Sequence, residues 1–226
     1  MWNRISIRLA PLIATMLLIS YGLAWQQMDR HKADFSALFA AATLYKQDRP
    51  VYDLSAQCEI ESNVGATLCL PFTHPPILLR LMALVVTDDY DQSYWRWVGI
   101  LALVVLLCAI PLYRITNDPT KCLSLIAFFP IYLSMLQGQD SAFILLAILT
   151  WAALLLTRRD ALAGLALSLA AIKPHVALAL GIPLLFCRSR AFACFVLGCA
   201  LLALYSLVLV GPDGMKGDRR SDKSPS

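Results

Sequence analysis

Hydrophobic positions in this chain are gathered into long blocks, and short polar segments separate the blocks. A helix that crosses the hydrocarbon core of a bilayer needs about 20 mostly apolar residues. The blocks therefore predict an all-α, polytopic transmembrane helical bundle with about seven spans. The expected spans are Ile5–Gln26, Tyr94–Tyr113, Cys122–Leu136, Ala142–Leu156, Ala161–Ile172, Val176–Phe186 and Phe192–Val210.

The first block has the basic start of a signal peptide, with Arg4 and Arg8 before the apolar run. The apolar core of a signal peptide is roughly 7–15 residues long and is followed by a cleavage site with small residues. This run is longer, and Trp25-Gln26-Gln27 is a poor cleavage site. We expect an uncleaved transmembrane helix.

Basic residues lie in alternate connections of the predicted bundle, and the positive-inside rule places that side in the cytoplasm, together with the N-terminus. These residues are Arg4, Arg8, Arg114, Lys121, Arg158, Arg159, Arg188 and Arg190. The long loop 28–93 and the short turns at Gln139 and Lys173 then share the outer side. We expect residues 1–210 to form one transmembrane domain and residues 211–226 to be a disordered polar tail.

The outer loop 28–93 is expected to carry interfacial helices. Asp34 opens an amphipathic stretch as its N-cap, and this helix should lie along the membrane surface. The stretch places Phe35, Leu38, Phe39 and Ala42 on one face. After the Pro75-Pro76 pair, a helix over Ile77–Val86 is too short to cross about 30 Å of hydrocarbon, so we expect it to be interfacial or re-entrant.

Two cysteines, Cys58 and Cys69, lie in the same outer loop without CxxC spacing or a matching histidine cluster. In an oxidising compartment such a pair forms a disulfide more readily than a metal site. The acidic residues and histidines of the chain show no usual metal-ligand spacing either, so we expect neither a metal nor another cofactor.

The blocks Ala161–Ile172 and Val176–Phe186 are each too short for a crossing at 1.5 Å per residue. If they form a hairpin, Lys173 and His175 lie recessed in a cavity in the outer half of the membrane. A single tilted helix over 161–186, kinked at Pro174, is the alternative.

Composition supports a membrane protein, because 59% of the residues are hydrophobic, 15% are charged and the mean hydropathy is +0.65. A globular domain has about 25% charged residues. The net charge of +4 comes from lysines and arginines at the ends of the apolar blocks, which orient the chain and do not indicate nucleic acid as a partner.

A lysine among apolar blocks is costly and by default marks a functional site. On the predicted outer face, Lys173 and His175 meet Asp34, His74 and Gln139, while Asp140 is expected to cap the next helix. A carboxylate can take a proton from an attacking hydroxyl, and a cation can stabilise a departing phosphate. Arg80, on the short helix, either binds a lipid phosphate or has a surface role.

Five short motifs follow one another in order: Asp34-Phe35, Pro50-Val51-Tyr52-Asp53, Phe72-Thr73-His74-Pro75-Pro76, Gly138-Gln139 and Lys173-Pro174. Together they resemble glycosyltransferase family 87, whose members are bacterial integral-membrane enzymes of the GT-C type, similar to polyprenyl-phosphate-mannose-dependent α-mannosyltransferases. The resemblance implies that Asp34 is the catalytic acidic residue and that Lys173 helps to hold the phosphate of the donor. It also implies a polyprenyl-phosphate sugar donor, inversion at the anomeric carbon and a place in the bacterial inner membrane.

The chain departs from the family at His74, where the family tends to have tyrosine, and at Ser141, where it often has asparagine. The family also has further spans, and the resemblance therefore implies that the chain corresponds to the N-terminal half only. We expect a hexosyltransferase that passes a sugar to a lipid-linked or cell-envelope acceptor on the outer face, among membrane lipids. The alternatives are a transporter or lipid flippase component, in which Asp34 and Lys173 bind or relay the cargo, and an inactive truncated fragment.

Overall fold

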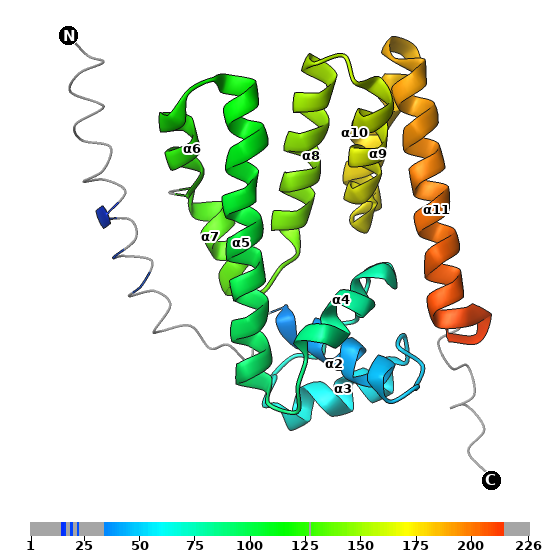
Figure 1. The fold of residues 1–226 in the computed structure, drawn as a ribbon. Helices are drawn as coiled ribbons and strands as arrows, with labels where there is room; N and C mark the ends of the chain where they lie inside the picture. Colours follow the sequence, from blue (N-terminus) through cyan, green and yellow to red (C-terminus); the bar gives the residue numbers. More distant parts are fainter. Residues whose placement is uncertain (1–14, 17–18, 20–21, 23–33, 127, 215–226) are drawn as a thin grey trace.

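The computed structural model describes residues 15–16, 19, 22, 34–126 and 128–214, and within them the chain forms ten α-helices and one 3-10 helix (Figure 1). The predicted first span lies outside the described residues apart from isolated positions, as does the tail beyond Gly214. The helices are α2 (Phe35–Lys46), α3 (Leu54–Asn63), α4 (Ile77–Val85), α5 (Tyr90–Thr116), α6 (Pro119–Ile126), α7 (Phe129–Leu136), α8 (Ser141–Leu156), α9 (Asp160–Ser168), η2 (Leu169–Ile172), α10 (Pro174–Cys187) and α11 (Ser189–Gly214).

The described residues contain two helices that are long and apolar enough to cross a membrane, α5 and α11, or three spans if the bent pair α6–α7 counts as one. The apolar blocks that fall on described residues are helical, although 122–136 is divided between α6 and α7 and 161–172 between α9 and η2, and seven spans are not found. The reason is length, because α8 has 16 residues and α10 has 14. At 1.5 Å per residue such helices reach roughly 21–24 Å, less than the about 30 Å of hydrocarbon.

Helices α2, α3 and α4 gather at one end of the bundle of α5 to α11 (Figure 1). The prediction that α2 is a one-sided surface helix is wrong, because Phe35, Ala40 and Leu44 are all 0% exposed although they point in different directions. The ring of Phe35 packs against Tyr90 and Tyr94 of α5, with centroids 5.4 and 5.6 Å apart. Helix α2 is therefore the buried centre of this end of the molecule.

The chain between α8 and α11 forms an antiparallel hairpin, so the single helix over 161–186 is excluded. Asp160 at the start of α9 and Arg188 after the end of α10 form an ion pair of 3.4 Å. This ion pair joins the two ends of the hairpin that lie away from its turn. Lys173 forms the turn between η2 and α10 in an extended conformation, with φ −115° and ψ 91°. Pro174 begins α10 at its first position, where the missing N–H costs nothing.

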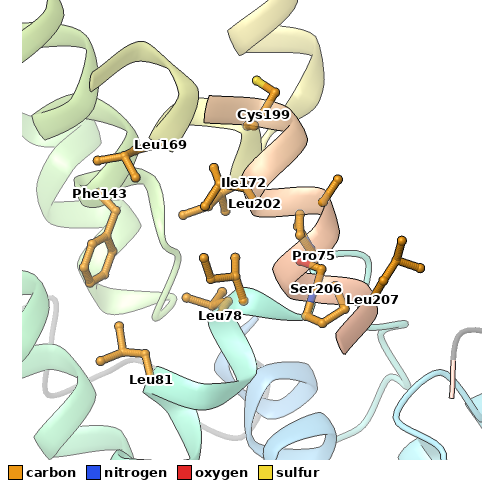
Figure 2. Close-up of a pocket in the computed structure, with 14 residues that line it drawn as sticks. Pro75, Leu78, Leu81, Phe143, Leu169, Ile172, Cys199, Leu202, Ser206 and Leu207 are labelled. Carbon is orange, nitrogen blue, oxygen red and sulfur yellow. The ribbon is translucent and has the colours of Figure 1, made fainter. Parts of the chain in front are cut away.

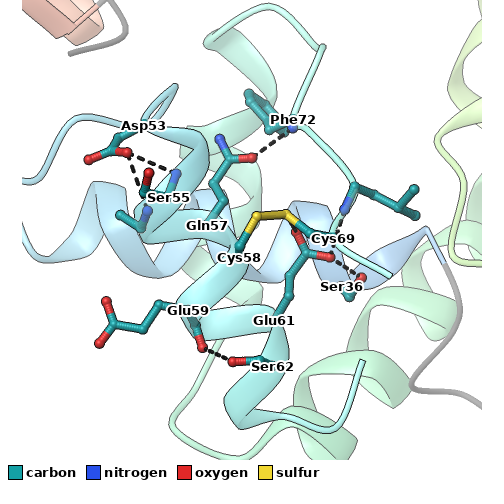
Figure 3. The surroundings of a disulfide bond; sticks show 12 residues. Ser36, Asp53, Ser55, Gln57, Cys58, Glu59, Glu61, Ser62, Cys69 and Phe72 are labelled. Atoms are coloured by element: carbon teal, nitrogen blue, oxygen red, sulfur yellow. Dashed lines mark hydrogen bonds between the residues drawn. A yellow bond between two sulfur atoms is a disulfide. The ribbon is translucent and has the colours of Figure 1, made fainter. Parts of the chain in front are cut away.

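A disulfide joins Cys58 on α3 to Cys69 in the segment that leads to α4 (Figure 3). Two buried side chains of α3 hold the same segment. The Gln57 side-chain oxygen accepts a hydrogen bond from the N–H of Phe72 at 2.9 Å, and Glu61 accepts one from the N–H of Leu70 at 3.2 Å. The segment that ends at His74 is therefore fastened to α3 by one covalent bond and two hydrogen bonds.

Replacing Cys58 and Cys69 with serine is expected to lower the stability of the folded chain by about 2–3 kcal/mol, because the disulfide closes a loop of 11 residues. The measurement is the thermal unfolding midpoint in detergent, with and without reductant. Cys187→Ser, at an exposed free cysteine, is the matched control and should leave the midpoint unchanged. Equal midpoints for the double variant and the parent chain would contradict this expectation.

Candidate functional site

The turn between α7 and α8 is fixed by contacts with α2 and α5. Gly138 has φ +71°, a conformation that favours glycine, and a Cβ there would collide with the side chain of Phe35. The indole N–H of Trp97 donates to the carbonyl of Gly138 at 2.7 Å, and the N–H of Phe35 donates to the carbonyl of Gln137 at 3.0 Å. These bonds set the position of Gln139 and Asp140, which follow in the chain.

Asp140 lies between two basic side chains that come from distant segments. Its side chain is 1% exposed; Lys173 Nζ is 3.3 Å from Oδ1 and His74 Nε2 is 3.5 Å from Oδ2. Burial alone would raise the pKa of the Asp140 carboxyl, but the hydrogen-bonding and charge effects of His74 and Lys173 outweigh it and lower the pKa below its usual value. The lowered pKa favours the ionised form of the carboxylate. The predicted side-chain cap of α8 by Asp140 is not found.

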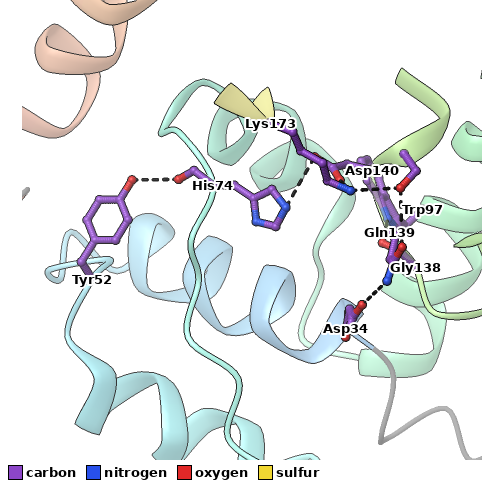
Figure 4. A network of polar contacts seen from close by, with 9 residues as sticks. Asp34, Tyr52, His74, Trp97, Gly138, Gln139, Asp140 and Lys173 are labelled. Carbon is purple, nitrogen blue, oxygen red and sulfur yellow. Dashed lines mark hydrogen bonds and ion pairs between the residues drawn. The ribbon is translucent and has the colours of Figure 1, made fainter. Parts of the chain in front are cut away.

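Asp34 also makes a long-range contact in place of the predicted cap. Its side chain makes no capping bond to α2, and instead it accepts a hydrogen bond of 2.5 Å from the side-chain amide of Gln139. The Gln139 side-chain oxygen lies 3.5 Å from the hydroxyl of Ser141, which in turn accepts a hydrogen bond of 3.0 Å from Lys173 Nζ. Asp34 and Lys173 are thus the two ends of one polar network (Figure 4).

A cavity of about 300 Å³ opens among these side chains. Asp34 borders it from the start of α2, His74 from the segment before α4, Asp140 from the turn before α8 and Lys173 from the tip of the hairpin. The complete lining is Asp34, Ala37, Leu38, Leu70, Pro71, Thr73, His74, Gln139, Asp140 and Lys173. The charged and basic side chains of this lining are the carboxylates of Asp34 and Asp140, the ammonium group of Lys173 and the imidazole of His74.

Four of the residues predicted for the site meet in this cavity: Asp34, His74, Gln139 and Lys173. The other two, His175 and Arg80, are exposed and do not line this cavity. His175 is the second residue of α10, after Pro174, and Arg80 lies on the exposed face of α4.

The residue that the sequence-based prediction misses is Asp140. The available signal was an acidic residue directly after Gln139, on the same predicted face as Lys173 and His74. Its preference for a helix N-cap explained its position locally and concealed the longer-range ion pairs.

A second cavity, of about 590 Å³, lies next to the first and is almost wholly apolar (Figure 2). Pro75 and Ile172 line it, and each is the chain neighbour of a residue of the polar cavity, His74 and Lys173 respectively. The rest of its lining comes from Pro76, Ile77, Leu78, Leu81, Phe143, Leu169, Ala171, Cys199, Leu202, Ala203, Ser206 and Leu207.

Within the described part of the chain, no group of three or more histidine, cysteine, aspartate and glutamate side chains is arranged to hold a metal ion. The polar cavity offers one lysine and one histidine to an anion, and a carboxylate to a proton. Side chains of these types are able to bind an anion and to accept a proton.

Acid is expected to weaken the Asp140 cluster. Because the folded-state pKa of Asp140 is depressed, its contribution to stability is complete above the ordinary aspartate pKa of about 3.9 and is lost as the pH falls through the lower folded-state value. The measurement is the unfolding midpoint against pH for the parent chain and Asp140→Asn. The difference between the two should shrink at the acidic end; a constant difference across the range would contradict the ion-pair interpretation.

Comparison with known proteins identifies a family for the chain. Residues 72–217 of the 226-residue chain match the sequence profile of glycosyltransferase family 87. The matched stretch includes His74, Gln139, Asp140 and Lys173, and Asp34 precedes it. No curated protein and no solved structure matches the chain. The match covers more than half of the chain and agrees with its apolar helices, and the chain therefore belongs to glycosyltransferase family 87.

Proposed function

We propose that this membrane glycosyltransferase moves a hexose from a polyprenyl-phosphate donor to a lipid-linked or cell-envelope acceptor, with inversion at the anomeric carbon. One observation carries the proposal: the Asp34 carboxylate and the Lys173 ammonium group, far apart in the sequence, line the same cavity. A transfer with inversion needs a base for the acceptor hydroxyl and a cation for the leaving phosphate in one enclosed space.

Asp34 is the proposed base. As the acceptor oxygen forms a bond to the anomeric carbon, Asp34 takes the hydroxyl proton, and the bonding electrons of the broken carbon–oxygen bond pass to the phosphate. Gln139 donates a hydrogen bond to Asp34 and fixes the orientation of the carboxylate before the acceptor binds.

Lys173 is the proposed phosphate ligand, with His74 beside it. Both border the polar cavity, and their chain neighbours Ile172 and Pro75 border the apolar cavity. A phosphate next to Lys173 would therefore have its prenyl chain directed among apolar side chains. This arrangement supports a lipid-phosphate donor over a water-soluble sugar nucleotide.

The proposed orientation puts the cavity on the extracytoplasmic face of the bacterial inner membrane. Figure 1 shows the α5–α6, α8–α9 and α10–α11 connections at the end of the bundle opposite to α2, α3 and α4. The basic residues of the chain's short connections lie in or next to these three turns, which supports a cytoplasmic location for that end. They are Arg114, Lys121, Arg158, Arg159, Arg188 and Arg190.

The test is transfer of a labelled sugar by the purified chain in liposomes, with polyprenyl-phosphate mannose and polyprenyl-phosphate glucose as donors and a bacterial envelope lipid extract as acceptor. We expect product from at least one of these donors, with inverted anomeric configuration, and none from the corresponding sugar nucleotide. Transfer with retention, or no transfer from either lipid donor, would overturn the proposal.

A further inference from the structure

Asp140 is a charged residue of the cavity that the proposed reaction leaves without a role. An anion in the wall of a phosphate site is unfavourable for binding, because it repels the ligand and occupies its cation. Here the carboxylate is 1% exposed and is paired with both basic side chains of the cavity, Lys173 and His74. A site selected only for tight phosphate binding would have a neutral residue at this position.

Asp140 lies on a turn that buried side chains hold in place. Its backbone follows Gly138, whose carbonyl accepts the Trp97 N–H at 2.7 Å, and the preceding Leu136 carbonyl accepts the hydroxyl of Tyr94 at 2.6 Å. Trp97 and Tyr94 are both 0% exposed. The backbone next to the carboxylate is therefore anchored at two carbonyls, whereas Lys173 is 29% exposed at the tip of the hairpin and has room to turn toward a ligand.

We propose that Asp140 is a fixed counter-ion that shares Lys173 with the phosphate of the lipid and thereby limits how tightly the cavity holds the polyprenyl phosphate released by the reaction. This inference rests on the proposed function. The donor carries one negative charge on its phosphodiester, and the released phosphomonoester gains a second. A cavity with Lys173 and His74 alone would bind this product more tightly than the donor and would release it slowly.

A purely structural ion pair predicts the opposite result. If Asp140 only maintains the shape of the cavity, its replacement loosens the site and weakens binding of charged and neutral lipids alike. If Asp140 competes for Lys173, its replacement strengthens binding of the phosphate only. The sign of the change and its dependence on the phosphate separate the two roles.

The experiment measures binding of farnesyl phosphate, a short polyprenyl phosphomonoester, and of farnesol, which lacks the phosphate, to the purified full chain in detergent. The pH is about 8, where the phosphomonoester is a dianion because its second pKa is about 6. For Asp140→Asn we expect the dissociation constant of farnesyl phosphate to fall about tenfold, since removing a like charge this close shifts affinity by at least that factor. The farnesol constant should not change.

Asp118→Asn is the matched control, because it makes the same change in charge at a partly exposed aspartate in the α5–α6 turn, at the other end of the bundle. Its affinity for farnesyl phosphate should equal that of the parent chain. Unchanged or weaker binding of farnesyl phosphate by Asp140→Asn would overturn the inference, as would an equal gain for farnesol.

This binding measurement is independent of turnover. If Asp140→Asn binds farnesyl phosphate more tightly but the parent chain transfers no sugar, the counter-ion role of Asp140 is supported and the proposed function is wrong. If the parent chain transfers sugar but the variant does not bind farnesyl phosphate more tightly, the proposed function is supported and the counter-ion role of Asp140 is wrong. In an active enzyme, Asp140→Asn should lower both kcat and the KM for the donor, because slow product release limits turnover.

Discussion

Asp34→Asn is expected to lower kcat for sugar transfer by about a thousandfold, within the range that a positioned general base contributes. Asparagine has nearly the shape of aspartate and can still accept the hydrogen bond from Gln139. The KM for the donor should therefore change little, because the phosphate is proposed to bind at Lys173. The measurement is initial rate against donor concentration in liposomes, with the amount of folded protein determined for each variant.

Asp88→Asn is the control for the Asp34 variant, because Asp88 is an exposed aspartate in the turn between α4 and α5, at the same end of the molecule as the cavity. It should keep the parent rate. An Asp34→Asn protein that folds and retains its full rate would show that another group takes the proton, and the role of Asp34 would then be limited to holding Gln139.

The helices could be predicted from the sequence because the apolar blocks record which segments avoid water. The short helix α4 follows from the same pattern, with Pro75-Pro76 before it, whereas the pattern left the hairpin at Lys173 and a single helix over 161–186 both open. The number of spans could not be predicted equally well, because hydropathy marks burial without telling whether lipid or protein covers a helix. Helix α8 is apolar along its whole length yet is shorter than the bilayer core is thick.

The contacts of the cavity depend on long-range geometry that local preferences do not contain. Aspartate is a good N-cap, and this preference applies equally to Asp34 and Asp140. In the structure each carboxylate instead meets a partner from another segment, Gln139 for Asp34 and Lys173 for Asp140. A single sequence gives the residue types that can meet, and only the fold decides which of them do.

Helix α3, which the sequence pattern does not predict, has an indirect part in the site. Most of its residues are polar, and only Ala56, Gln57 and Glu61 are buried. Two of these three hold the segment that carries His74, and burial raises the pKa of the Glu61 carboxyl although hydrogen bonds from Ser36 and Leu70 act in the opposite direction. A helix with few buried residues is therefore enough to hold the segment that leads to His74 in place.

Lys173→Met is expected to lower kcat/KM for the lipid donor about a hundredfold and to weaken farnesyl phosphate binding by at least tenfold. The charge-assisted contact to the phosphate is lost, and such contacts contribute both to binding and to stabilisation of the leaving group. The measurements are the same transfer and binding assays. Lys121→Met, an exposed lysine on α6 at the far end of the bundle, should behave like the parent chain.

A loss of activity in Lys173→Met has two physical explanations, because the variant also leaves the buried Asp140 with His74 alone. Breaking one side of a buried ion pair costs about 3–5 kcal/mol of stability, which could by itself reduce activity. The double variant Lys173→Met with Asp140→Asn removes both charges and should recover most of the lost stability. If Lys173 holds the phosphate, the double variant stays inactive despite folding; recovery of transfer would instead show that Lys173 serves only to neutralise Asp140.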